Sequence, residues 1–190
     1  IHIDFAEFKQ QNFLVVTDSY SKWLEIIPMK LTTSEKTIEK LRKLYSSWGL
    51  SEEVVSDNDP RFTSDVFKTF LRRNGIRQTH APAYPPKSNG AAERAVQILK
   101  KALKKQLFEE NNYGQKRSLN RRLARFLLKY RNCPQTTTKQ SPAELFLKRQ
   151  LRTRISLVKP NKGAQIERQQ ERMVKQHDKA HSTMSTFKIG

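Results

Sequence analysis

The chain has 190 residues and carries 37 Lys and Arg against 18 Asp and Glu, a formal net charge of +19. One cysteine excludes an internal disulfide and a cysteine-rich zinc site, and no apolar run approaches the roughly 20 residues that span a bilayer. We therefore expect a reduced, intracellular protein with no membrane partner. The chain begins within a strand-like run and without Met, so we interpret it as a piece of a longer protein.

The predicted strands are short and lie in the first half of the chain. They cover residues 1–8, 13–16, 23–27, 53–58 and 76–82. The first three are joined by tight polar connections, which predicts an antiparallel meander. After the meander, strands alternate with helical patterns, which favours parallel pairing and a layered α/β sheet.

Helical patterns separate the later strands and dominate the rest of the chain. One helix is predicted from a cap at Ser34 to Gly49, and a second from Thr63 or Ser64 to Asn74. A third begins at Gly90. Further on, the sequence predicts a polar connection at 109–118, a helix at 119–131, a capping box at 141–144, and a linker or solvated helix from 161.

The positive charge is concentrated in one segment. Residues 1–99 carry 14 basic and 12 acidic side chains, whereas residues 100–160 carry 17 basic and 3 acidic side chains. A surface charged only for solubility normally mixes both signs. The segment therefore favours a polyanion partner, and we expect a nucleic acid.

Carboxylates are the candidate chemical groups. Cys133 has no nearby His, and the chain lacks both a nucleophile elbow and a glycine-rich phosphate loop. Asp4 lies within a strand, Asp57 ends a short strand, and Glu93 lies near the start of a helix. Each has an ordinary explanation: Asp4 pairs with a cation, Asp57 is a turn residue, and Glu93 favours the helix dipole. Together they are also typical of a site for Mg²⁺ or Mn²⁺, with two ions.

Four motifs occur in order: "HIDF" from residue 2, "VVTDSYSKW" from 15, "VVSDNDPRFTS" from 54 and "YPPKSNGAAERAVQILK" from 84. They resemble the catalytic core of retroviral and retrotransposon integrases, especially the gypsy type. That family carries an Asp-Asp-Glu triad with 35 residues between the last two members, and 35 residues separate Asp57 from Glu93. The resemblance covers about residues 1–108. It implies a ribonuclease-H-like fold with a five-stranded mixed sheet flanked by helices, and it assigns the metals to Asp4, Asp57 and Glu93.

The resemblance also implies a division of the chain. Residues 1–108 would be the catalytic core and 109–160 a basic helical extension of it. Residues 161–190 would be a basic linker leading to a truncated small barrel, because "FKIG" at 187–190 looks like the start of that barrel. The family's zinc-binding N-terminal domain is absent from the sequence.

Three departures from the family pattern lie near the motifs. Asp59 stands where the family usually has Gly, Pro85 stands where it has His, and "AEF" follows "HIDF" in place of "AGP". None removes a triad member. An acid at position 59 would perturb metal binding or point to solvent, and a Gly there often supplies a positive φ. We interpret the departures as signs of an old or domesticated element, and Asp18 as structural.

The helix from Gly90 carries a polar stripe with helical spacing. After Glu93 the stripe contains Gln97, Lys100, Lys101 and Lys104, opposite an apolar face. Such lysines typically contact DNA phosphates, and an ordinary solvated face is the alternative. Tyr84 and Asn89, in the loop before the helix, are further DNA-contact candidates, and Arg121, Arg122 and Arg125 form a weaker basic patch.

The resemblance implies an integrase that processes DNA 3′ ends and transfers strands to target DNA. It further implies a dimer or tetramer acting in the nucleus, with a cytoplasmic stage during element replication. The alternative is an inactive integrase-derived module that binds DNA or protein. A ribonuclease-H-type nuclease is a weaker third possibility, because the 35-residue spacing argues against it.

Overall fold

The computed structural model describes residues 1–80, 90–114, 116–157 and 162–184. The chain divides into two compact units, Ile1–Leu151 and Arg152–Gly190. No helix within the described ranges is long and apolar enough to cross a membrane.

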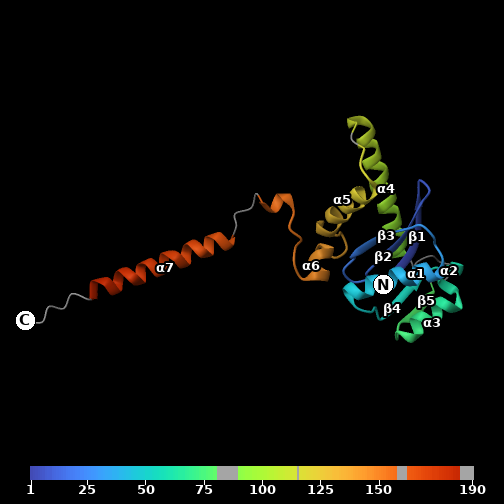
Figure 1. Cartoon of the computed structure of the whole chain (residues 1–190), viewed down its shortest axis with the longest axis horizontal. Coiled ribbons are helices and arrows are strands. Elements are labelled where there is room, and N and C mark those ends of the chain that lie inside the picture. The colour runs from blue at the N-terminus through green and yellow to red at the C-terminus, as the bar shows by residue number, and fades with distance from the viewer. Residues whose placement is uncertain (81–89, 115, 158–161, 185–190) are drawn as a thin grey trace, which may run out of the picture. The chain divides into compact units, whose positions relative to one another are not determined.

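A five-stranded mixed sheet forms the centre of the first unit, in the order β3-β2-β1-β4-β5 (Figure 1). The strands are β1 His2–Phe8, β2 Gln11–Thr17, β3 Leu24–Met29, β4 Glu53–Ser56 and β5 Arg77–His80. The first three pair antiparallel, and β4 joins β1 and β5 in parallel. The predicted meander, the parallel half and the mixed five-stranded sheet are therefore confirmed.

Helices cover both faces of the sheet (Figure 1). The helices of the first unit are α1 Ser34–Trp48, α2 Pro60–Thr63, α3 Asp65–Arg73, α4 Gly90–Tyr113, α5 Leu119–Asn132 and α6 Pro142–Leu147. Because side chains alternate along a strand, β1 directs Ile3 to a core shared with α1, α2 and α3, and Ala6 to a second core shared with α4 and α5. The side chains of β1 therefore divide between two hydrophobic cores.

The helix caps differ from the prediction in one place. Thr33, not Ser34, caps α1, and its side chain accepts the N–H of Lys36 at 3.3 Å. The Ser34 hydroxyl instead donates to the Arg61 carbonyl at 2.8 Å and accepts from the Ser64 hydroxyl at 2.8 Å. Ser34 thus links α1 to the start of α3. Ser64 caps α3, as one of the two predicted alternatives.

Helix α4 continues through Tyr113, so the polar connection expected from residue 109 is wrong for its first five residues. The physical reason is a buried ion pair: the Glu110 side chain is 2% exposed and accepts from Arg122 Nε at 3.0 Å. Arg117 completes the cluster at 3.9 Å. The polar residues 109–113 therefore stay helical, because Glu110 among them pairs with Arg117 and Arg122, which follow the end of α4.

The extension is anchored to the sheet by Arg131 of α5. Its guanidinium lies over the Trp23 ring at 4.1 Å, donates to the Leu24 carbonyl at 2.8 and 3.1 Å, and contacts Glu25 at 2.8 Å. Leu24 lies on an edge strand, whose carbonyls have no strand partner on the outer side. The Trp23 ring also stacks on Phe146 of α6 with ring centroids 4.9 Å apart. Helix α5 therefore packs on β3, and α6 packs on Trp23, the residue before that strand.

The second unit contains the 3₁₀ turn η1 Arg154–Leu157 and the helix α7 Lys162–Met184. All of its described side chains from 166 to 178 are exposed. Of the two sequence interpretations, the solvated helix is therefore confirmed. The predicted boundaries at 108 and 160 stay predictions, and "FKIG" lies outside the described residues.

Candidate active site

Two of the three predicted carboxylates lie side by side on neighbouring strands. The parallel register pairs His2 with Val55, and Asp4 and Asp57 each follow two residues later. Because side chains two apart share a face, both acids project on the same side as Ala6, whose partners include α4. The predicted position of Asp57 after a buried strand is confirmed, since β4 ends at Ser56.

Asp4 is half-buried, and its carboxylate accepts the N–H of Phe5 at 2.7 Å. Burial raises the pKa of Asp4 from 3.8 to about 6, and the charges of Asp57, Glu93 and Asp59 add to the rise, against the Phe5 hydrogen bond. Three acids from two other segments of the chain thus act on Asp4. A carboxylate with this environment is a functional-site candidate.

Glu93 is in the first turn of α4 and is exposed. It reaches Asp4 through its charge, but the described residues contain no group of three or more His, Cys, Asp or Glu placed to hold a metal ion. The donor chemistry nevertheless fits Mg²⁺, which prefers carboxylate oxygens, and a divalent cation would offset the clustered negative charge that raises the pKa of Asp4. Asp4, Asp57 and Glu93 are the residues that would hold it.

Asp59 does not project as a free acid into this cluster. Its φ is −56°, so Asp59 does not adopt the positive φ that a Gly often supplies at such a turn. The side chain caps α2 by accepting the N–H of Arg61 at 2.9 Å, and it accepts Arg61 Nε at 2.6 Å. The hydrogen bonds from Arg61 hold the pKa of Asp59 below its usual value. The extra acid of the motif is thus already paired with a cation.

Arg61 is the residue that sequence reasoning missed. Its guanidinium lies over the Phe5 ring at 3.9 Å, on the face of β1 that packs against α2. Its pKa is raised first by Asp59, and then by the charges of Asp57 and Asp4. The available signal was the Asp-Pro-Arg sequence at 59–61, in which a helix cap, a proline at the first helical position and a cation follow in order.

The predicted stripe on α4 is partly exposed. Gln97, Lys101 and Lys104 are exposed and Lys100 is half-buried, whereas Ala95 and Leu99 pack against the sheet. Within the described part of the chain, none of these lysines makes an ion pair with an acid. They are therefore available to an anionic partner. Tyr84 and Asn89 lie outside the described residues, so those two predictions are not addressed.

Contacts bear on two other predictions. Arg122 pairs with the buried Glu110, whereas Arg121 and Arg125 are exposed, and the DNA contact of this patch stays a prediction. Asp18 accepts the N–H and the hydroxyl of Ser21 at 2.7 and 2.6 Å. Its structural interpretation is confirmed, because these bonds close the turn between β2 and β3.

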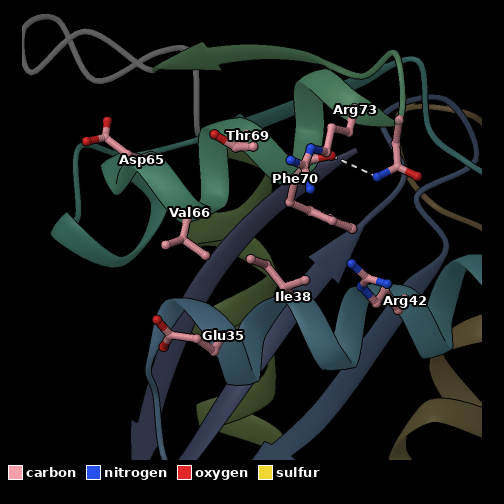
Figure 2. A pocket seen from close by; sticks show the side chains of 9 residues that line it. Glu35, Ile38, Arg42, Asp65, Val66, Thr69, Phe70 and Arg73 are labelled. Carbon is pink, nitrogen blue, oxygen red and sulfur yellow. Dashed lines mark hydrogen bonds between the residues drawn. The ribbon is translucent and has the colours of Figure 1, made fainter.

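A separate hollow of about 570 Å³ lies between α1 and α3 (Figure 2). Ile38 and Phe70 line it, Glu35 and Asp65 lie toward one end, and Arg42 lies toward the other. In Figure 2 the dashed line is the Asn74 amide donating to the Phe70 carbonyl at 2.8 Å. None of the three predicted carboxylates lines this hollow, so it is distinct from the candidate site.

Sequence comparison places the first part of the chain in a known family. Residues 1–86 match the family described as "Integrase core domain"; the match includes Asp4 and Asp57 and ends before Glu93. An uncharacterized protein of Caenorhabditis elegans is 36% identical over 162 residues, covering 84% of this chain and 12% of that protein. The Pol polyprotein of a feline endogenous virus is 34% identical over 138 residues, covering 70% of this chain and 13% of the polyprotein. This chain thus spans a small part of its relatives.

Solved structures share the fold. A simian T-cell lymphotropic virus intasome chain matches with a TM-score of 0.68 and 24% identity, covering 80% of this chain and 55% of that one. The catalytic core of BIV integrase matches with a TM-score of 0.61 and 21% identity, covering 77% of this chain and 92% of that one. The HTLV-2 integrase core, solved with magnesium in a trimeric form, matches with a TM-score of 0.59 and 20% identity. The match covers 76% of this chain and 91% of that one. The sheet order and flanking helices are therefore those of the predicted ribonuclease-H-like fold. The family match, the retroviral relative and the common fold together identify residues 1–86 of this chain as an integrase core domain.

Proposed function

We propose that the chain is the catalytic core of a retroelement integrase, a polynucleotidyl transferase that processes DNA 3′ ends and joins them to target DNA. The observation that carries the proposal is that Asp4 lies in β1 and Asp57 directly follows the adjacent parallel strand β4 of an integrase-like sheet. We assign Glu93, at the start of α4, as the third carboxylate. Its charge already acts on Asp4.

We propose that the three carboxylates hold Mg²⁺ or Mn²⁺. When bound, such ions stabilise the negative charge of the phosphodiester during an in-line displacement. The chain's own contribution is to fix two carboxylates through the β1–β4 register and to bring the third on a helix packed against the same face. Cys133, the single cysteine of the chain, is exposed at the end of α5.

We further propose DNA as the substrate and partner, a homo-oligomer as the working form, and the nucleus as the site of action. The support for DNA is the +14 charge of residues 100–160, from 17 basic and 3 acidic side chains, with exposed lysines continuing from Glu93 along α4. The support for an oligomer is by likeness, because the HTLV-2 integrase core is described in a trimeric form. The nucleus follows from the proposed substrate.

The catalytic proposal is tested by strand transfer and disintegration of labelled DNA in Mn²⁺, with the chain and its Glu93→Gln variant. We expect product from the chain, none in EDTA, and a background level from the variant. Equal product from both proteins would overturn the assignment. DNA binding without product from either protein would favour the inactive DNA-binding module instead.

The lysine stripe makes a separate prediction. Replacing Lys100 and Lys104 together by Gln is expected to reduce the slope of log affinity against log salt concentration by about two, since each lost phosphate contact removes about 0.9. The measurement is fluorescence anisotropy of labelled duplex DNA across salt concentrations. The control replaces Lys43 and Lys68, which are exposed on α1 and α3. If both double variants change the slope equally, the lysines of α4 are not specific contacts.

A further inference from the structure

A guanidinium lies at the edge of the carboxylate cluster and has no role in the proposal above. Arg61 follows Asp57 by four residues, and its guanidinium lies 3.9 Å from the centroid of the Phe5 ring, which packs on the opposite face of β1 from Asp4. The Asp59 N–H donates to the Asp57 carboxylate at 3.2 Å, and the Asp59 side chain accepts from Arg61 Nε at 2.6 Å. The pKa of Arg61 is raised mainly by Asp59 and further by the charges of Asp57 and Asp4. Hydrogen bonds therefore link the cation to Asp57 through Asp59.

The Arg61 side chain is fixed from several directions. Nε donates to Asp59 Oδ1 at 2.6 Å, a second bond joins Nη2 to Oδ2, and the Arg61 carbonyl accepts from Ser34 at 2.8 Å. The Phe5 ring beneath it is stacked on the fully buried Phe62, with centroids 4.8 Å apart and 7° between planes. A side chain held in this way has lost most of its rotamer freedom before any ligand arrives.

The guanidinium also keeps donors to offer. Arginine has five N–H groups in a planar fork, and Asp59 engages two of them. No other hydrogen bond from the guanidinium is found within the described residues, and 33% of the side chain is exposed. A planar fork with unused donors matches the oxygens of a phosphate better than an ammonium does.

The charges around the site require such a group. Asp4, Asp57, Asp59 and Glu93 together repel a phosphodiester, and like charges a few ångströms apart interact strongly outside bulk water. Arg61 is the cation whose pKa responds to three of these four acids. Its partner Asp59 orients it without removing it from the site.

We propose that Arg61 is a positioning residue that holds a backbone phosphate of the bound DNA strand beside Asp57, and that Asp59 fixes its orientation. This inference rests on the proposed function. The competing explanation is a local ion pair that only stabilises α2. Such exposed pairs contribute little to stability, and a purely structural pair would not change the salt dependence of DNA binding.

The test measures DNA affinity against salt concentration by anisotropy in EDTA, and Mn²⁺-dependent product formation separately. Arg61→Gln is expected to lower the salt slope by about one. Asp59→Asn is expected to leave the salt slope unchanged, because Arg61 keeps its charge. It is expected to lower kcat about tenfold, because the Arg61 side chain is no longer held by its ion pair. The matched control is Arg72→Gln, an exposed arginine of α3 with the same change of charge and no expected change of slope.

A urea unfolding curve shows whether Arg61→Gln folds. If it does not fold, Arg61→Lys is the second variant. It keeps the charge and loses the fork, so the slope should hold while kcat falls. An unchanged slope for Arg61→Gln, or the same change for Arg72→Gln, would overturn the phosphate contact. An unchanged kcat for Asp59→Asn would overturn the orienting role. If the unmodified chain gives no product, the proposed function fails, and the binding slope still decides whether Arg61 contacts phosphate.

Discussion

Replacing Asp4 by Asn is expected to abolish metal-dependent product, by at least about 10²-fold, while making the protein more stable above pH 6. The two effects have one cause. A carboxylate placed beside other acids in a half-buried position is unfavourable for folding, and the same placement lets it serve a divalent cation. Asn retains the oxygen that accepts the Phe5 N–H, so the variant loses the charge and keeps the local bond.

The sign of the pH dependence follows from the direction of the pKa shift. The pKa of Asp4 is raised from 3.8 to about 6 in the folded chain, mainly by burial. The folded state therefore binds the proton more tightly than the unfolded state, and the stability from this group is present below pH 3.8 and is lost as pH rises through 6. The shift corresponds to at most about 3 kcal/mol, which solvent screening of a half-buried carboxyl reduces to about 1 kcal/mol.

The measurement is the free energy of unfolding in urea at pH 4 and pH 7.5, with EDTA present. We expect Asp4→Asn to match the unmodified chain at pH 4 and to exceed it by about 1 kcal/mol at pH 7.5. Adding Mg²⁺ should stabilise the unmodified chain and not the variant, because a ligand that binds only the folded state shifts the unfolding equilibrium. A gain of equal size at both pH values would contradict the electrostatic explanation. Equal stabilisation by Mg²⁺ would remove Asp4 from the metal site.

The sheet could be predicted from the sequence because the local pattern of apolar residues agrees with the packing of these strands in the folded chain. The alternation of apolar residues around Asp4 defined β1, and the short apolar run before Asp57 defined β4. The parallel pairing of these strands then follows from the α/β pattern, whereas their register is seen only in the structure. The position of two of the three carboxylates was thus predictable from periodicity.

The misses share a different physical origin. Helix α4 runs past residue 109 because Glu110 meets Arg122 from α5, and Ser34 leaves the cap to Thr33 because Ser64 and the Arg61 carbonyl offer it partners. In both cases a polar side chain is satisfied by a residue distant in the sequence. Propensity and spacing do not report such pairings. Arg61 was missed for a related reason, since its contact with Phe5 crosses from α2 to β1.

Arg131 is expected to strengthen the attachment of the extension beyond residue 108, in addition to the hydrophobic core that α5 shares with the sheet. Arg131→Ala should lower the free energy of unfolding by about 3 kcal/mol, because removing one partner of a largely buried pair leaves the other uncompensated. Glu25, 20% exposed in its side chain, would lose its cation, and the Leu24 carbonyl would lose both donors. The Trp23 ring would also lose the guanidinium that covers one face.

The urea midpoint measured by tryptophan fluorescence reports this loss, and Arg125→Ala is the matched control. Arg125 lies on the same helix and is exposed, so its removal should change the free energy by less than about 0.5 kcal/mol. Equal effects would show that Arg131 does not anchor α5 to β3. If residues 109–151 pack as part of the core, the loss appears as a lower midpoint of one cooperative transition. A separate early transition would instead mean that the extension unfolds on its own, as an independent domain beginning near residue 109 would.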